Sequence, residues 1–266
     1  MNSAIKFIEE KTGGLKPDTA LILGSGLGDY TTGMEGITIP YSEIDGFPVS
    51  SVKGHKGSLF FTEKFGKTVV VMQGRVHYYE GYSMEQVTFP VKLFKKIGVQ
   101  KLIITNAAGS LDKELPPGDL MLIKDHINFM GSNPLIGKND DLTGERFPDM
   151  SEIYDKKLRE LALLCAKENN IPLHEGVYVG TTGPSYETPS EVKMLKILGG
   201  NVVGMSTVPE AIVANWAGMN VLGLSLVTNF ASGISGKKLS HNEVIEAGKT
   251  ASFKIVTLLN SILEEI

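Results

Sequence analysis

Apolar positions along this chain fall into short continuous runs that alternate with longer amphipathic stretches. The short runs have the length of strands and show no polar alternation, so each is expected to be buried on both faces of a sheet. They occupy residues 20–23, 69–72, 102–105, 177–179 and 221–227. The longer stretches have helical periodicity and occupy residues 84–97, 151–169, 189–198, 208–217 and 242–264. Alternation of this kind predicts an α/β fold.

Residues that favour helix starts and loops refine the bounds of these predicted elements. Ser83, Ser151 and Ser190 stand where three of the helices are expected to begin, and serine is a favoured helix cap. Residues 131–150 are polar and rich in Gly, Asn, Asp and Pro, which predicts a long ordered loop of the kind that tends to carry function. Neither a repeat nor a Pro/Gly-rich linker divides the chain, so residues 1–266 are expected to form a single domain.

Composition and charge narrow the function classes. A chain of 266 residues that is 42% hydrophobic buries about 75% of its unfolded surface, so it needs no disulfide or structural metal. The one cysteine, Cys165, lies in an apolar stretch and is expected to be an inert buried thiol, which fits a reducing cytoplasm. We find no signal peptide and no membrane-spanning run. The net charge of -4 argues against a general nucleic-acid binder, so an anionic ligand must be bound by local groups.

The first candidate ligand loop follows the apolar run at residues 20–23 and reads Gly-Ser-Gly-Leu-Gly over residues 24–28. Glycines let backbone amides approach an anion closely, and Ser25 adds a hydroxyl to the same loop. The dinucleotide pattern Gly-x-Gly-x-x-Gly is not met, because Asp29 stands at its third glycine, and no Gly-Lys-Ser/Thr follows for a triphosphate loop. The loop predicts a short phosphate cradle, with a purely structural tight turn as the alternative.

The second candidate is the pair Arg75 and His77, which follows the run at residues 69–72. Residues two apart in extended backbone point to the same side. An arginine fork matches a tetrahedral oxyanion, and a neighbouring imidazole can donate a hydrogen bond or handle a proton. The alternative is a surface salt bridge beside a histidine with its own partners. His55 is a weaker candidate of the same kind, since a lone loop histidine is usually solvated.

Further small or polar residues stand where strands are expected to end, which is where ligands bind in open α/β sheets. They lie within residues 105–110, 183–189, 204–210 and 228–234. Tyr186 beside Glu187 could stack a heteroaromatic base and accept its N–H hydrogens, although Glu187 could equally cap the next helix. Ser206 could bind an anion or serve as an ordinary cap, and residues 105–110 could form a plain tight turn. For His241, a capping or solvated role is the default.

Taken together and in this order, seven motifs closely resemble the trimeric purine nucleoside phosphorylase family over nearly the whole chain. They are GSGLG (24–28), QGRVHYYEGY (73–82), TNAAG (105–109), DHIN (125–128), GPSYET (183–188), GMSTVPE (204–210) and SLVTN (225–229). The resemblance implies the fold of that family, which is a single domain with a mixed twisted sheet surrounded by helices.

The resemblance also implies roles for individual residues. The implied phosphate site comprises Ser25, His55, Arg75, His77, the Ala107 amide and Ser206. The implied nucleoside site comprises Tyr79, Met205 and His241 at the ribose, with Tyr178 near the sugar, and Tyr186, Glu187 and Asn229 at the purine. Phe147 looks like the aromatic residue that this family inserts into a neighbouring subunit, so a homotrimer is implied. The resemblance implies no metal and no cofactor, with inorganic phosphate as co-substrate.

The implied activity is reversible phosphorolysis of inosine-like or guanosine-like nucleosides in cytoplasmic purine salvage. Cleavage of the ribosidic bond builds positive charge on the sugar and negative charge on the purine, and both need stabilisation. Our hypothesis places the Asn229 amide at purine N7 and the Glu187 carboxylate at N1–H and any 2-amino group, with His77 at the phosphate. Neutral adenine has no hydrogen on N1, so 6-oxopurines are expected to be preferred.

Three alternatives stay open at the level of sequence. Methylthioadenosine phosphorylase resembles this chain in its phosphate loops but typically has aspartate where Asn229 stands. A non-catalytic nucleoside sensor would keep both pockets without turnover, and an NAD-dependent dehydrogenase conflicts with the displaced glycine. Two positions depart from some family members, since Tyr186 stands where they have phenylalanine and Phe230 where they have lysine, which bears on base preference.

Overall fold

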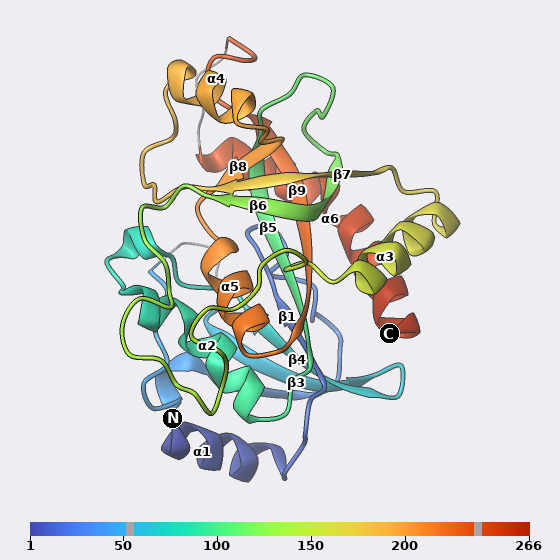
Figure 1. Ribbon diagram of the computed structural model, residues 1–266. Helices are drawn as coiled ribbons and strands as arrows, with labels where there is room; N and C mark the ends of the chain where they lie inside the picture. Colours follow the sequence, from blue (N-terminus) through green and yellow to red (C-terminus); the bar gives the residue numbers. More distant parts are fainter. Residues whose placement is uncertain (52–55, 237–240) are drawn as a thin grey trace.

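Nine strands form one mixed sheet in the computed structural model, which describes residues 1–51, 56–236 and 241–266, with the backbone alone for 241–251 (Figure 1). The strands are β1 (Thr19–Ile22), β2 (Ile37–Pro40), β3 (Ser58–Lys64), β4 (Lys67–Gln73), β5 (Lys101–Ser110), β6 (Leu120–Asn128), β7 (Leu173–Gly180), β8 (Val202–Gly204) and β9 (Asn220–Phe230). The helices are α1 (Asn2–Thr12), α2 (Met84–Lys96), α3 (Lys156–Glu168), α4 (Pro189–Ile197), α5 (Val208–Trp216) and α6 (His241–Glu265). The predicted α/β fold is confirmed.

Helices cover both faces of the central strands, as the continuous apolar runs predict. In β1 and the residue after it, the side chains alternate between two apolar clusters. Ala20 and Ile22 belong to the cluster that includes α1, α2 and α5, while Leu21 and Leu23 belong to the cluster that includes α3 and α6. The two groups of helices lie on opposite sides of the sheet in Figure 1. Each large side chain buried in this way contributes about 1.5–3 kcal/mol to stability. Strand β1 is an interior strand of the sheet and pairs in parallel with β4 and β5.

Part of the sheet closes on itself, which the apolar runs do not predict. Strand β9 pairs with β5 in parallel and with β6 in antiparallel fashion, so that β5, β8, β7, β6 and β9 form a ring. The β5–β9 ladder contains a bulge: Ala108 pairs with Val227, but Gly109 pairs with Asn229. Thr228 is therefore the extra residue of β9. Two successive side chains of this strand can consequently face the same region.

One alternative and two local predictions are wrong. Residues 105–110 do not form a tight turn, because they continue β5 through Ser110. The helix predicted at 151–169 begins at Lys156, because the Asp155 carboxylate accepts a hydrogen bond from the Leu158 amide at 2.8 Å and so caps it. Helix α4 is capped by Thr188 in place of Ser190, with Pro189 as its first residue.

Some elements have too little apolar signal to be predicted. Helix α1 buries only three of its residues, and β8 has only three residues in all. Strand β6 is buried in its first half and polar in its second half, so its apolar run is short. By contrast, residues 131–150 contain no helix or strand, which confirms the predicted long loop.

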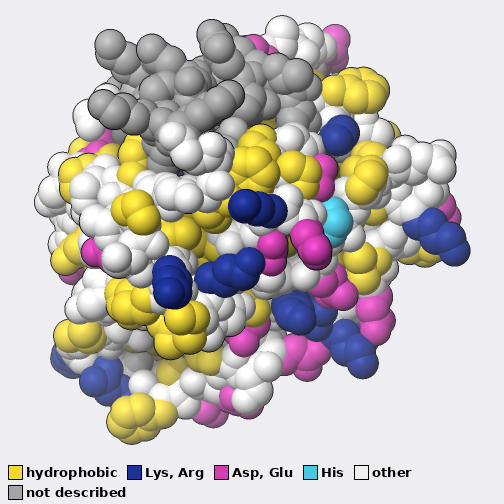
Figure 2. Space-filling model, turned by 90° about the horizontal axis from the view of Figure 1, so that it is seen from above, with side chains coloured by type: hydrophobic (Ala, Val, Ile, Leu, Met, Phe, Trp, Pro, Cys, Tyr) yellow, Lys and Arg dark blue, Asp and Glu magenta, His cyan; other side chains and the backbone are white. Residues whose placement is uncertain are grey.

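Charge is not segregated among the described side chains on the face that Figure 2 shows. Acidic and basic side chains are intermixed there, with hydrophobic side chains between them. In the part of the chain that the structure describes, none of the helices is long and apolar enough to cross a membrane. Cys165 is a free, fully buried thiol, as predicted, and burial raises its pKa.

Candidate active site

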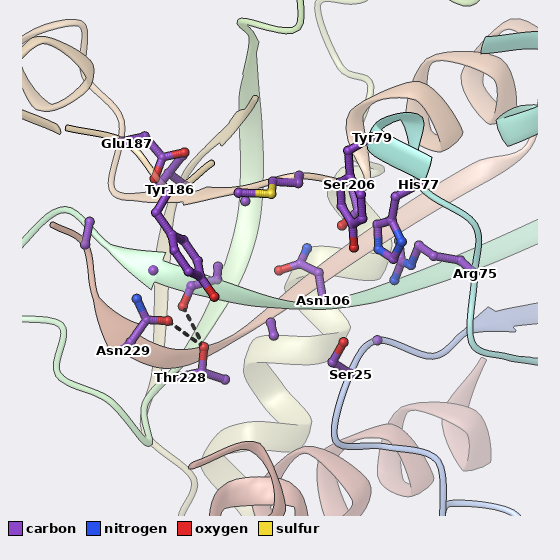
Figure 3. Close-up of a pocket in the computed structure, with 18 residues that line it drawn as sticks. Ser25, Arg75, His77, Tyr79, Asn106, Tyr186, Glu187, Ser206, Thr228 and Asn229 are labelled. Atoms are coloured by element: carbon purple, nitrogen blue, oxygen red, sulfur yellow. Dashed lines mark hydrogen bonds between the residues drawn. The ribbon is translucent and has the colours of Figure 1, made fainter. Parts of the chain in front are cut away.

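One pocket collects residues from the ends of several strands and from the loops that follow them. It is lined by Gly24, Ser25, Arg75, His77, Tyr79, Asn106, Ala107, Ala108, Gly109, Tyr186, Glu187, Val203, Gly204, Met205, Ser206, Thr228, Asn229 and Ala231. Figure 3 shows two ends: Ser25, Arg75, His77, Tyr79 and Ser206 lie on one side, and Tyr186, Glu187, Thr228 and Asn229 on the other. Asn106 lies between the two groups.

Close packing of β1 against β5 places Ser25 in the pocket. The Gly24 amide donates to Thr105 Oγ1 at 2.9 Å. A Cβ at Gly24 would lie 2.7 Å from the Cα of Asn106, which is closer than real contacts allow. Glycine is therefore required at this position for the loop to leave the strand so close to Asn106.

Arg75 is a buried cation at the same end of the pocket. Its side chain is only 2% exposed, and its Nη1 lies 3.1 Å from Oε1 of Glu210 on α5. Its Nη2 also donates to the backbone carbonyl oxygen of Thr105. These two contacts fix the plane of the guanidinium, so the alternative of a surface salt bridge is wrong.

A carboxylate orients His77. Glu80 Oε1 accepts from the His77 backbone amide at 2.7 Å and lies 3.1 Å from His77 Nδ1. Burial alone would raise the pKa of Glu80, but hydrogen bonds from His77 and Ser51 lower that pKa to about 2. Because Glu80 is ionised at neutral pH, it favours a proton on Nδ1 of the imidazole. The His77 ring also stacks on Tyr79, with centroids 4.7 Å apart.

Ser206 is held by a compact turn at the start of α5. Its amide donates to the hydroxyl of Tyr178 at 3.3 Å, and its Oγ lies 3.1 Å from Oγ1 of Thr207. Thr207 has φ 73° and ψ -50°, and the Val208 amide donates to the Ser206 carbonyl at 2.8 Å. These are the features of a classic γ-turn, which is a strained conformation. Thr207, not Ser206, occupies the cap position of α5.

The opposite end of the pocket carries an acceptor and an amide. Thr181 Oγ1 donates to Glu187 Oε1 at 3.0 Å, and Glu187 makes no cap to α4, whose cap is Thr188. Thr228 Oγ1 donates to Asn229 Oδ1 at 2.9 Å, and Asn229 Nδ2 donates to the Phe230 carbonyl at 3.0 Å. Both the carboxylate and the amide are thus oriented before a ligand arrives.

Comparison with known proteins identifies the family. A model of the phosphorylase superfamily matches residues 18–264. Purine nucleoside phosphorylase 1 of Geobacillus stearothermophilus is 52% identical over 100% of this chain and 97% of that protein. The chain belongs to the purine nucleoside phosphorylase family. The crystal structure of Schistosoma mansoni purine nucleoside phosphorylase in complex with inosine has a TM-score of 0.93 at 42% identity, and it covers 100% of this chain and 95% of that one.

Most of the residues expected from the purine nucleoside phosphorylase resemblance meet in this pocket. Ten of them line it: Ser25, Arg75, His77, Tyr79, Ala107, Tyr186, Glu187, Met205, Ser206 and Asn229. Two do not. Tyr178 is 0% exposed and lies behind Ser206, so it does not line the pocket itself. Phe147 is 85% exposed and lies outside the pocket of its own chain. His55 lies outside the described residues, as does the side chain of His241.

Four polar residues at the site of this purine nucleoside phosphorylase family member were not singled out from the sequence. Asn106 and Thr228 line the pocket, and Glu80 and Glu210 hold His77 and Arg75 from behind it. All four lie within the family motifs. Periodicity could have found Glu80, since it stands three residues after His77 in a short helical turn. Glu210 and Arg75 are 135 residues apart, so only the fold brings them together.

Proposed function

We propose that this protein catalyses the reversible phosphorolysis of 6-oxopurine ribonucleosides and deoxyribonucleosides, such as inosine and guanosine. The products are the free base and the corresponding (deoxy)ribose 1-phosphate. The observation that carries the proposal is the division of the pocket: groups suited to an oxyanion lie at one end, and a carboxylate and an amide suited to a purine lie at the other (Figure 3). Membership of the purine nucleoside phosphorylase family supports it.

Inorganic phosphate is the co-substrate at the first end. Ser25, Arg75, His77, the Ala107 amide and Ser206 bind its oxygens, together with His55. The Arg75 guanidinium can bond two phosphate oxygens, and hydroxyls and amides fill the remaining positions. Bound in this way, phosphate attacks the anomeric carbon and stabilises the positive charge that develops on the sugar. The reaction uses no metal or other cofactor.

The second end stabilises the departing purine. Asn229 bonds N7, where its amide meets the developing negative charge or a proton on that nitrogen. Glu187 accepts from N1–H and from any 2-amino group, and Tyr186 packs against the ring. Tyr79, Met205 and His241 bind the ribose between the two ends. Burial raises the pKa of Tyr79 to about 12, so its hydroxyl keeps its proton at neutral pH.

Base choice follows from Glu187, because only a purine with hydrogen on N1 satisfies the carboxylate. Binding of a nucleoside in the pocket says less about base preference than its rate of cleavage does. One relative, Schistosoma mansoni purine nucleoside phosphorylase, has been crystallised in complex with adenosine. Tyr186 and Phe230 differ from some family members and adjust this preference.

A turnover assay tests the proposal. The purified protein is incubated with inosine and phosphate, and hypoxanthine and ribose 1-phosphate are expected in equal amounts, with none formed when phosphate is omitted. Binding of inosine without products would indicate a nucleoside sensor instead. Rates with guanosine and methylthioadenosine are measured side by side, and faster cleavage of methylthioadenosine would reassign the protein to that related activity.

The assembly, the location and the physiological role complete the proposal, and they rest on the family resemblance. We place the protein in the cytoplasm, in purine salvage, as a homotrimer in which Phe147 enters a neighbouring subunit's pocket. Exposed apolar side chains just before and within the loop that carries Phe147 support this assembly: Phe129, Ile136 and Leu142 are 48%, 76% and 95% exposed. Packing against a neighbouring subunit would bury apolar surface of this kind.

A further inference from the structure

Arg75 at the pocket and Glu210 behind it form a buried ion pair. The two side chains are 2% and 4% exposed, and their atoms Nη1 and Oε1 are 3.1 Å apart. Arg75 lines the pocket, but Glu210 does not. Glu210 lies in the first turn of α5, only a few residues after Ser206. The pair therefore connects the residues after β4 to the helix that follows the Ser206 turn.

Burial of the Glu210 carboxylate is unfavourable unless other groups compensate for it. Glu210 Oε2 is buried and has no hydrogen-bond partner among the described residues, so the environment satisfies this carboxylate only in part. Leaving a buried polar atom unpaired destabilises the fold, and such an atom often marks a functional constraint. An unpaired guanidinium at the site of Arg75 would be more unfavourable still, because it would be a buried charge without a counter-charge.

The start of α5 also holds Ser206, which is another of the proposed phosphate ligands. The strained turn at Thr207 is fixed by a hydrogen bond of 2.9 Å from Asn106 Nδ2 to Thr207 Oγ1. The turn presents Ser206, and the next helical turn presents Glu210 to Arg75. One short segment thus sets the positions of Ser206 directly and of Arg75 through Glu210.

We propose that Glu210 is a positioning residue for phosphate recognition, which holds Arg75 in its binding orientation and neutralises it while the pocket is empty. This inference rests on the proposed phosphate site. When the anion arrives, the arginine fork is already in place, so little conformational entropy is lost on binding. Because Arg75 and Glu210 together carry no net charge, the anion is held mainly by directed hydrogen bonds.

Two substitutions of Glu210 test the charge of its side chain separately from the length of that side chain. Glu210→Gln keeps the shape and removes the charge, and Glu210→Asp keeps the charge but withdraws it from Arg75 by about 1.5 Å. For each variant, calorimetry measures the Kd of phosphate and, separately, of hypoxanthine. We expect both variants to bind phosphate about 10-fold more weakly, since a charge-assisted hydrogen bond is altered. The Kd of hypoxanthine, which binds at the other end, should change less than about twofold.

Val213→Ala is the matched control. Val213 lies on the same helix, is fully buried and does not line the pocket, so its truncation destabilises α5 without touching Arg75. A merely structural role for Glu210 would make its variants behave like this control, with a lowered Tm and an unchanged phosphate Kd. That result, or phosphate affinity within about twofold of the parent protein in either Glu210 variant, would overturn the inference. If Glu210→Gln fails to fold, Glu210→Asp decides.

Arg75→Gln distinguishes failure of this inference from failure of the proposed function. Loss of phosphate binding in Arg75→Gln, together with unchanged binding in the Glu210 variants, would remove only the positioning role. Unchanged phosphate affinity in Arg75→Gln would instead remove the proposed phosphate site itself.

Discussion

Asn229 is the side chain on which leaving-group stabilisation depends. Asn229→Ala should lower kcat/KM for inosine by about 100-fold or more, as found when preorganised donors are removed from other active sites. The measurement is the initial rate of hypoxanthine release at saturating phosphate. Asn215→Ala is the control, because Asn215 bonds the Asp149 carbonyl outside the pocket. Near-normal turnover by Asn229→Ala would remove Asn229 from the mechanism.

Glu187 sets the preference for the base. Glu187→Gln retains the side-chain length but offers an amide in place of a carboxylate, so it should lower kcat/KM for inosine and guanosine about 10-fold or more. Glu191→Gln is its matched control, since Glu191 belongs to the capping box of the adjacent helix and does not line the pocket. Equal losses in the two variants would contradict the assignment.

His126 makes stability depend on pH. Burial lowers its pKa to about 4, partly opposed by Asp125, whereas the unfolded chain has an ordinary histidine pKa of about 6.5. Between these values the unfolded state binds the extra proton, so stability should fall as pH drops from 7 towards 4. At pH 5 this contribution amounts to about 2 kcal/mol. Urea unfolding at pH 7 and pH 5 should show a smaller difference for His126→Gln than for the parent protein, and an equal difference would refute it.

At the scale of elements, two helices offer a controlled comparison. Both α2 and α4 begin with a complete capping box, at Ser83 and Thr188. Ser83→Ala and Thr188→Ala should each lower the free energy of unfolding by about 1 kcal/mol. Only Thr188 directly follows a pocket residue, Glu187, so only Thr188→Ala should also raise the KM for inosine. Thermal unfolding and steady-state kinetics check both parts, and a KM effect in Ser83→Ala as well would contradict them.

The strands and the pocket also show which features could be predicted from the sequence. Strands such as β1 were predictable because both of their faces are buried, which leaves an uninterrupted apolar run. The bulge in the β5–β9 ladder was not, because it depends on how Gly109 and Asn229 pair across the sheet. In the pocket, Ser25, Arg75 and Glu187 were found because their motifs are local. Glu210 was missed because its partner is remote in the chain.

At the scale of the whole molecule, the proposed trimer makes each pocket depend on a neighbour. Phe147 is 85% exposed in the single chain, so Phe147→Ala should leave the stability of the subunit nearly unchanged. It should raise the KM for inosine while the KM for phosphate stays the same. Light scattering gives the mass in solution, which should be three times that of the chain. A monomeric mass with full activity would exclude a neighbour's contribution.

The bulge at Thr228 has a consequence for how this chain tolerates change. In a regular strand, Thr228 and Asn229 would face opposite sides, yet both line the pocket because one residue is inserted between Val227 and Asn229 in the pairing. The extra residue reverses the side of the strand that each later side chain faces. A single deletion between residues 224 and 227 would shift the strand relative to the bulge and turn the Asn229 amide away from the pocket. Because residues 224–228 are also buried, both the length of this stretch and its side chains are constrained.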